Sequence, residues 1–149
     1  MTEELDQATP RPPVAVSVVG QTFEVDVGPV AHGGHCVARH EGRVVFVRHA
    51  LPGERVRVTV TEGGATSKFW RADAVEVRSP SPDRVAPPCP WAGPGRCGGC
   101  DWQHANLTAQ RELKATVVRE QLAHLAGIDR AVVVEEVPGD VGGLGWRTR

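Results

Sequence analysis

Apolar and polar residues alternate in short runs over the first half of the chain, and glycine or proline separates one run from the next. The clearest alternation lies within residues 54–62, where every second residue from Val56 to Val60 is valine and the residues between are polar. Because successive side chains of a strand point to opposite faces, this pattern predicts a half-buried β-strand. Similar β-branched or alternating runs predict further strands over residues 14–19, 21–27, 36–39, 43–47 and 68–77.

These strands predict one small β domain over residues 14–78. No helical spacing of apolar residues interrupts them, and turns are expected at His40–Gly42 and Ala50–Glu54. The first of these turns joins two strands into a hairpin. Because closure leaves no strand edge unpaired, so many short strands favour a small OB-like β-barrel. The predicted fold class is mainly β, followed by a C-terminal α/β extension.

The extension starts with a predicted amphipathic helix over about residues 109–126. Asn106 or Thr108 can cap its start, and Gly127 can cap its end. A strand is expected over residues 131–137. The helix has one apolar stripe, which we expect to pack on a further domain or on the cysteine-rich loop before it. The residues of this stripe are Leu113, Val117, Val118, Leu122 and Leu125.

Composition narrows the class of protein. The 149 residues are 40% hydrophobic, which allows a modest core, and their formal net charge is −1. A global positive charge is therefore excluded, so a nucleic-acid partner must meet a local patch. No apolar run is long enough to span a bilayer, and the acidic start Met1–Asp6 lacks the apolar region of a secretory signal. We expect a cytoplasmic protein with no membrane partner, whose residues 1–13 form a flexible tail.

Three of the four cysteines lie close together, after a proline-rich linker over residues 79–88. Cys89, Cys97 and Cys100 fall within a loop over residues 89–104, and two glycines separate the last two cysteines. The cytoplasm keeps thiols reduced, so metal ligands are a simpler interpretation than disulfides. Thiolates at this density are typical ligands of zinc or of an iron–sulfur cluster.

The fourth ligand of such a site stays open on spacing alone. His104 would complete a zinc site of three cysteines and one histidine. Cys36 would have to reach across from the predicted barrel, where a lone cysteine is more often a small buried apolar residue. The third and preferred possibility is a ligand beyond Arg149, because the last residues resemble the start of a further strand.

Three segments of the predicted barrel resemble a TRAM domain, a small OB-like barrel found on RNA-modifying enzymes. They are Gly33–Arg39, Gly42–Val47 and Ala50–Val56, and the Leu-Pro-Gly-Glu turn after a Phe-Val strand is the most specific part. The resemblance implies that this domain binds RNA. Residues 31–78 hold eight Lys or Arg against five Asp or Glu, a modest surplus that is compatible with this role.

Several residues of the barrel are candidates for RNA contact. Phe69, Trp70 and Arg71 can form an aromatic platform beside a cation, which suits single-stranded nucleic acid. The alternative is that Phe69 or Trp70 belongs to the core, and that Arg55 and Arg57 are merely the solvated face of a strand. The full set of candidates is Arg39, Arg43, Arg55, Arg57, Lys68, Trp70 and Arg71.

The cysteine loop resembles the iron–sulfur motif of the RNA uracil-C5 methyltransferase family. Cys97-Gly-Gly-Cys100 followed by Gln103-His104 carries this resemblance, although the first gap between the cysteines is longer than the family's. The resemblance implies a [4Fe–4S] cluster on the three clustered cysteines, with a fourth cysteine from farther along the chain. It also implies that residues 105–149 begin a truncated central or catalytic region.

Members of this family methylate C5 of a uridine in ribosomal or transfer RNA, using S-adenosylmethionine and a nucleophilic cysteine. The sequence holds neither a Gly-rich strand–turn–helix for that cofactor nor a cysteine after the loop. We expect the RNA-binding, cluster-bearing N-terminal portion of such an enzyme, monomeric and inactive alone, with rRNA or tRNA and not DNA as partner. The alternative is a stand-alone TRAM-type RNA-binding protein with a structural zinc site. A small electron-transfer protein is a weaker alternative.

Overall fold

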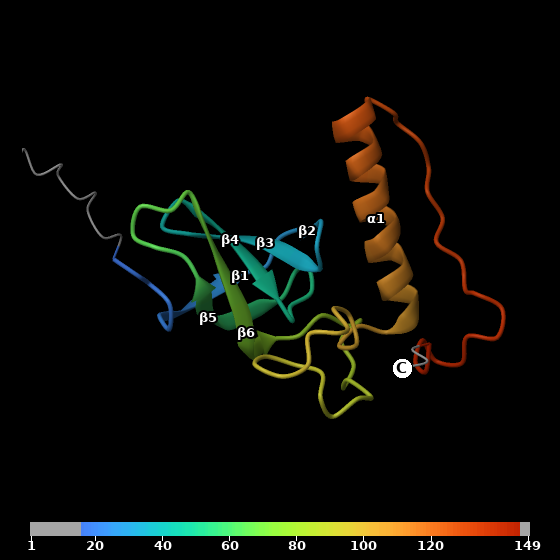
Figure 1. Cartoon of the computed structure of the whole chain (residues 1–149), viewed down its shortest axis with the longest axis horizontal. Coiled ribbons are helices and arrows are strands. Elements are labelled where there is room, and N and C mark those ends of the chain that lie inside the picture. The colour runs from blue at the N-terminus through green and yellow to red at the C-terminus, as the bar shows by residue number, and fades with distance from the viewer. Residues whose placement is uncertain (1–15, 147–149) are drawn as a thin grey trace, which may run out of the picture.

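A six-stranded sheet and one helix make up the regular structure of the computed structural model, which describes residues 16–146 (Figure 1). Along the sheet the strands run in the order β1-β5-β6-β4-β3-β2, and every neighbouring pair is antiparallel except β4 and β6. The elements are β1 (Thr22–Asp26), β2 (Val30–Ala31), β3 (His35–His40), β4 (Arg43–Arg48), β5 (Arg55–Glu62), β6 (Phe69–Ser79) and α1 (Leu107–Ala126).

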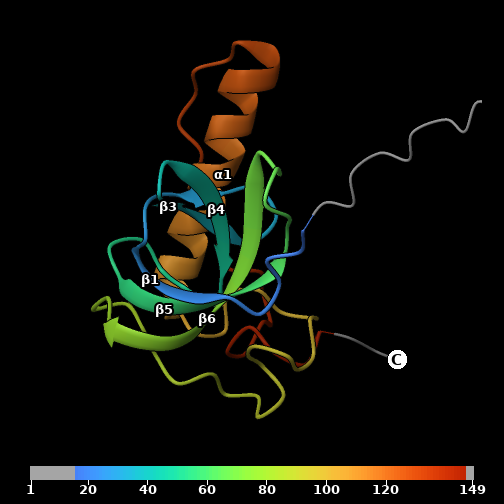
Figure 2. The same cartoon turned by 90° about the vertical axis from the view of Figure 1, so that its left-hand side faces the viewer.

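The sheet curls into an OB-like half-barrel, which confirms the predicted fold class (Figure 2). Its two ends approach one another after β1, where the Gly28 N–H donates to the Val37 carbonyl at 2.7 Å and the Val37 N–H donates to the Pro29 carbonyl at 2.9 Å. The rings of Phe23 on β1 and His40 on β3 stack at 3.7 Å. Backbone and ring contacts together hold the curl of the half-barrel, because they join β1 and the residues after it to β3, which lies next to the far end of the sheet order.

The predicted alternation of β5 is confirmed. Val56, Val58 and Val60 are fully buried, whereas Arg55 and Arg57 face solvent. The hairpin between β3 and β4 is also confirmed, and its two turn residues, Glu41 and Gly42, both have positive φ. This conformation matches the right-handed twist of the flanking strands.

Two predicted strands are wrong. Residues 16–19 form only one isolated bridge, from Ser17 to Gly64, and the rest of that run lies outside the described residues. Residues 131–137 pair with no strand in the described part of the chain, and Val133 and Val137 are exposed. Both runs are β-branched, but a strand also needs a partner for its backbone groups. The predicted tail over residues 1–13 lies outside the described residues.

Helix α1 starts two residues earlier than predicted and ends where expected. The Asn106 side chain accepts from the Ala109 N–H and caps the start, while Gly127 caps the end in the left-handed conformation. Leu113 packs against the barrel, but Leu125 near the other end is 76% exposed. Figure 1 shows α1 rising away from the sheet, with the segment after it running back alongside. Within residues 16–146, no helix has the length and apolar character needed to cross a membrane.

Candidate nucleic-acid interface and cysteine loop

A buried carboxylate in the Leu51–Glu54 turn joins the barrel to the linker. Glu54 is fully buried, and its carboxylate accepts from the N–H groups of Leu51 at 2.8 Å and Ser81 at 3.0 Å. The Arg84 guanidinium adds two bonds, at 2.6 and 2.8 Å. Burial alone would raise the pKa of Glu54, but Arg84 and the two N–H groups outweigh it, so the pKa lies below its ordinary value. The carboxylate therefore stays ionised.

The same linker also reaches the cysteine loop. The Arg84 guanidinium donates to the His49 carbonyl at 2.8 Å, and the Val85 N–H donates to the His104 carbonyl at 2.9 Å. These bonds hold the linker against the barrel and against the end of the loop. The domain boundaries at residues 79–88 and 89–104 stay a prediction.

Gln103 and His104, the pair that follows the last cysteine, fasten the loop in two different ways. The Gln103 side-chain oxygen accepts from the Cys89 N–H at 3.1 Å and so closes the loop on itself. His104 is 4% exposed, and its Nε2 donates to the Ala50 carbonyl of the barrel at 3.2 Å. Burial lowers the pKa of His104 to about 4, which keeps the ring neutral. The His104 imidazole therefore joins the loop to the barrel.

A third attachment of the loop is the ion pair of Asp101 with Arg48 of β4, at 2.9 Å. Gly34, in the turn before β3, makes this approach possible: a Cβ there would lie 2.6 Å from the Asp101 carboxyl carbon. Gly34 also has a φ of 76°, which disfavours any side chain. The Gly-Gly run that supported the TRAM resemblance therefore has a packing reason in this chain.

The cysteine loop offers thiols, which are the right type of ligand for a metal or an iron–sulfur cluster. In the structure, however, these thiols are not gathered around one point. Cys97 is exposed, Cys89 and Cys100 are half-buried, and none of the four cysteines forms a disulfide. Among residues 16–146, no three His, Cys, Asp or Glu side chains are gathered as a metal would need. The metal site therefore stays a prediction, carried by the chemistry of three free thiols on one loop.

Cys36, one candidate for the fourth ligand, is buried in the barrel core. Its thiol points to the Ala50 carbonyl at 3.6 Å, and burial, reinforced by the charge of Glu54, raises its pKa to about 12. A thiol held protonated in the core does not supply the thiolate that a metal binds. Cys36 is therefore not supported as the fourth ligand, and it is better interpreted as a small buried apolar residue of the core.

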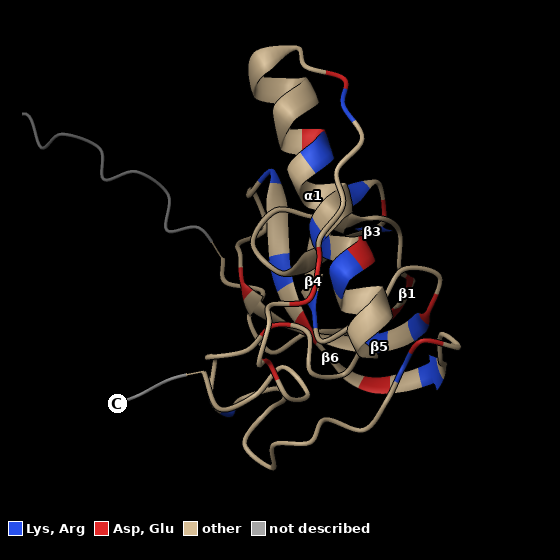
Figure 3. Cartoon of the chain, turned by 90° about the vertical axis from the view of Figure 1, so that its right-hand side faces the viewer, with Lys and Arg blue, Asp and Glu red and all other residues tan. Residues whose placement is uncertain are grey.

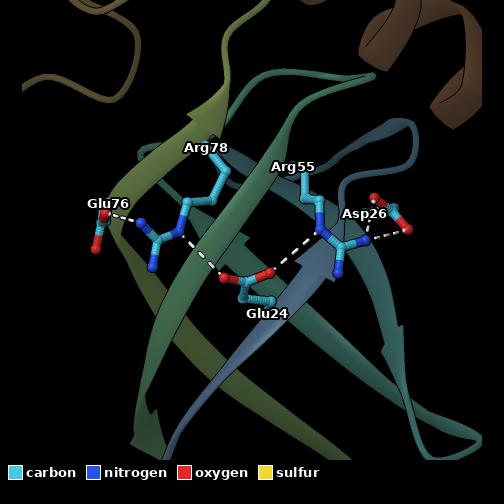
Figure 4. Close-up of polar contacts among 5 residues, drawn as sticks. All are labelled: Glu24, Asp26, Arg55, Glu76 and Arg78. Atoms are coloured by element: carbon cyan, nitrogen blue, oxygen red, sulfur yellow. Dashed lines mark hydrogen bonds and ion pairs between the residues drawn. The ribbon is translucent and has the colours of Figure 1, made fainter.

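Most of the predicted RNA-contacting arginines are engaged with carboxylates. Arg55 binds Glu24 and Asp26, each at 3.2 Å, and Arg78 binds the other oxygen of Glu24 at 3.1 Å (Figure 4). The Arg78 side chain also pairs with Glu76. The pKa of Glu24 is lowered, first by its hydrogen bond from Arg78 and then by that from Arg55. This cross-strand network occupies the outer face of β1, β5 and the end of β6.

Two further candidates, Arg57 and Arg71, are paired in the same way. Arg57 binds Glu76 at 2.8 Å and Arg71 binds Glu62 at 2.8 Å. On the side drawn in Figure 3, acidic and basic residues are mixed along the strands and do not gather into one basic patch. On this side of the molecule the sequence surplus of cations therefore does not become a strongly positive face.

Trp70 lies in the core rather than on the surface. It is 8% exposed, and its indole N–H donates to the Gly64 carbonyl at 2.9 Å. The Arg43 guanidinium covers its ring at 4.5 Å and donates to the Gly64 and Ala65 carbonyls at 3.2 and 2.9 Å. In the predicted platform, the exposed ring is thus Phe69 and not Trp70.

Arg39 and Lys68 differ from the other candidates. Within the part of the chain that the structure describes, neither makes an ion pair, and both side chains are exposed. Arg43 also lacks an ion pair there, but its guanidinium donates to the Gly64 and Ala65 carbonyls, so Arg39 and Lys68 are the candidates most accessible to a phosphate. Whether any of the candidates contacts RNA stays a prediction.

Sequence reasoning missed the residues that hold the parts together. Glu54 was predicted only as part of a turn, and neither Arg84 nor Asp101 was a candidate. The available signal was chemical: a carboxylate directly after Leu-Pro-Gly, and a proline-rich linker that contains a single arginine. Pairing these two needs the fold, because 30 residues separate them.

The fold and this arrangement define the class of domain, and comparison with known proteins agrees. A family model described as "TRAM domain" matches residues 16–75. The half-barrel described above covers the same part of the chain, so the chain carries a TRAM domain.

The comparison also finds longer relatives that match most of the chain. The chain is 67% identical over 114 residues to an "Uncharacterized RNA methyltransferase" of Streptomyces coelicolor, which covers 76% of this chain and 25% of that protein. It is 40% identical over 119 residues to the "23S rRNA (uracil(1939)-C(5))-methyltransferase RlmD" of Alkalilimnicola ehrlichii, which covers 80% of this chain and 26% of that protein. The chain matches the N-terminal part of these RNA methyltransferases and spans about a quarter of the length of these relatives.

One solved structure is also similar to part of the chain. The solution structure of a conserved protein of Methanococcus maripaludis is 32% identical and covers 48% of this chain and 99% of its own, with a TM-score of 0.34. The TRAM fold of this chain is assigned from the strand order and from the family match.

Proposed function

We propose that this chain is the RNA-recognising portion of a cytoplasmic, S-adenosylmethionine-dependent methyltransferase that acts on C5 of a uridine in ribosomal or transfer RNA. The observation that carries the proposal is a TRAM half-barrel in a sequence similar to a uracil-C5 methyltransferase of 23S rRNA. The chain spans about a quarter of that relative, so methyl transfer and the binding of S-adenosylmethionine belong to the longer protein.

The described residues suit RNA binding better than catalysis. The barrel presents exposed cations and rings on its outer surface, which suits binding rather than bond making. The buried ionisable groups of the chain, such as Glu54 of the barrel and His104 of the cysteine loop, are satisfied by neighbours of the same chain. The chain therefore positions RNA, and the reaction is carried out elsewhere in the enzyme.

The proposal includes a [4Fe–4S] cluster on Cys89, Cys97 and Cys100, with zinc as the alternative metal. Three free thiols on one loop, closed by Gln103 and fastened by His104, support it. Because His104 is buried against the barrel whereas Cys97 is exposed, we favour a fourth ligand from outside the described residues. A bound cluster would bring the three thiols together and stiffen the loop that joins the barrel to α1.

Equilibrium binding tests the RNA-recognition part of the proposal. Fluorescence anisotropy of the whole 149-residue chain with a labelled single-stranded RNA containing uridine should give saturable binding. A DNA of the same sequence, in the same salt, is the matched control and should bind more weakly. No saturable RNA binding, or equal affinity for the DNA, would contradict the proposal.

Metal analysis tests the cluster separately. The chain purified without oxygen should be brown and contain about four iron atoms per molecule, the content of a [4Fe–4S] cluster. A variant in which Cys97 and Cys100 are both serine should lose the iron, whereas Cys36→Ser, at the buried thiol, should keep it. Stoichiometric zinc without iron would overturn the iron–sulfur assignment and leave the RNA-binding proposal standing.

A further inference from the structure

The outer surface of the half-barrel has two faces of different chemistry. Over β1, β5 and the end of β6 it carries the ion-pair network of Arg55, Glu24 and Arg78. Over β3, β4 and the start of β6 the outward residues are instead mostly apolar or aromatic. Because Cys36 and Ala38 of β3 point into the core, the residues between and after them point outward.

Register places these outward residues in two rows across three neighbouring strands. One row joins Arg39, Val44 and Phe69, and the other joins Val37, Phe46 and Arg71. Neighbours in such rows lie on the same side of the sheet. We call the surface that they form the aromatic face, which consists of Val37, Arg39, Val44, Phe46, Phe69 and Arg71, with His35 at its edge.

The rings of the aromatic face touch one another and remain accessible. Phe46 and Phe69 meet edge to face at 5.4 Å, and His35 meets Phe46 in the same manner at 6.1 Å. Phe69 is 42% exposed, and the other two rings are half-buried. None of these three rings belongs to the buried core of the barrel, whose interior is filled mainly by valines. Rings held outside the core and still accessible are what a stacking ligand needs.

The charges around the aromatic face are nearly balanced. The Arg71 guanidinium lies 5.6 Å from the Phe69 ring centre and also pairs with Glu62, while Arg39 has no carboxylate partner among the described residues. At the other end of the face Arg48 pairs with Asp101, and the Asp73 side chain is nearby on β6. Phosphate attraction at this face is therefore modest, and the ring surfaces are its distinguishing feature.

We infer that the aromatic face binds unpaired bases of single-stranded RNA, which stack on Phe69 and Phe46 while Arg39 and Arg71 flank the backbone. This inference rests on the proposed RNA recognition and names the site and the form of RNA. A duplex hides the faces of its bases, so a paired segment cannot stack in this way. The Arg48–Asp101 ion pair makes this face continuous with the cysteine loop.

The test removes the rings and keeps the apolar volume. The double variant F46L/F69L should bind single-stranded RNA at least about fivefold more weakly than the unchanged chain, since stacking on an aromatic ring accounts for much of such binding. F23L makes the same chemical change on β1, at a ring that packs on His40 and the core and is not part of the aromatic face, and should bind nearly as the unchanged chain does. Circular dichroism of all variants checks that they are folded.

A second comparison separates stacking from ionic binding. Arg55→Gln breaks the charged network on the other face and should leave RNA affinity unchanged within about twofold. Unchanged affinity of F46L/F69L, an equal loss in F23L, or a larger loss in Arg55→Gln would each overturn the inference while RNA recognition stands. An unchanged chain that binds no RNA would instead count against the proposed function.

Discussion

At the residue scale, the carboxylate of Glu54 holds the barrel and the linker together. It binds its own turn, the linker at Ser81 and the Arg84 guanidinium, and it has no exposed surface. Removing one partner of such a buried pair leaves the other charge without compensation. The folded state of the barrel and linker therefore depends on this one ion pair more than on any of the exposed pairs.

Glu54→Gln should lower the free energy of unfolding by about 3 kcal/mol, because Arg84 loses its counter-charge in a mostly buried site. Urea denaturation measures this change. The matched control is Glu62→Gln, which breaks the exposed pair with Arg71 and should cost no more than about 0.5 kcal/mol. Equal effects of the two substitutions would show that the buried pair has no special role.

The same carboxylate predicts a pH dependence. Its pKa in the folded chain is lower than the ordinary 4.5, so its stabilisation is fully present above about pH 4.5 and is lost as the pH falls through the folded value. Glu54→Gln cannot titrate there. Its stability should fall less steeply than that of the unchanged chain below pH 4.5, and parallel acid unfolding curves would contradict this assignment.

At the element scale, the cysteine loop lies against the barrel through the close approach of Asp101 to Gly34. Gly34→Ala should push the loop away, because a Cβ would overlap the Asp101 side chain and the φ of 76° adds backbone strain. Gly42→Ala is the matched control: its φ is 79°, but no atom lies within 4 Å of the added Cβ.

Both glycine variants should lose about 1 kcal/mol of stability to backbone strain, and Gly34→Ala about 1–3 kcal/mol more to overlap. Amide exchange over residues 97–104 should accelerate in Gly34→Ala and stay unchanged in Gly42→Ala. If the two variants match in both measurements, the loop does not depend on this contact.

Helix α1 allows a direct choice between the two caps that the sequence left open. Asn106→Ala should cost about 1 kcal/mol, since its side chain accepts from the Ala109 N–H at 2.8 Å. Thr108→Ala changes an exposed residue already inside the helix and should cost less than about 0.5 kcal/mol. Urea midpoints of both variants give the comparison, and the reverse order would contradict the assigned cap.

Patterning predicted some elements well and failed on others for a physical reason. Strands β1, β3, β4, β5 and β6 were predictable because alternation reports which side of a strand is buried, whereas the two-residue strand β2 was not predicted. The run over residues 131–137 has the same β-branched composition, yet it stays extended and exposed because the described chain gives its backbone no partner. Whether residues 131–137 form a strand depends on a partner strand, and the local sequence carries no information about that partner.

The candidate site was predictable only in part, because local sequence does not say which cations are already paired. Arg55 and Arg57 look free in the sequence, but cross-strand carboxylates occupy them in the fold. Trp70 looked like a surface platform, and alternation along β6 instead places it inside, with Phe69 and Arg71 outside. Phe46 was missed because its two ring neighbours come from other strands.

At the scale of the whole molecule, three parts of the chain meet around the turn after β4. The barrel contributes Leu51, which packs with Ala105 and Ala109 at the start of α1. The linker contributes Arg84, and the cysteine loop contributes His104. Because each part is fixed to the same turn, RNA bound on the aromatic face would be held in a set orientation relative to the loop and to α1.

The most direct test of this account is to map where RNA lies on the intact chain. Photo-crosslinking with a single-stranded RNA containing 4-thiouridine, followed by mass spectrometry, identifies the residues in contact. We predict crosslinks on the aromatic face, within residues 35–46 and 68–71. Crosslinks confined to β1 and β5, or none at all, would contradict the claim that this chain recognises RNA through that face.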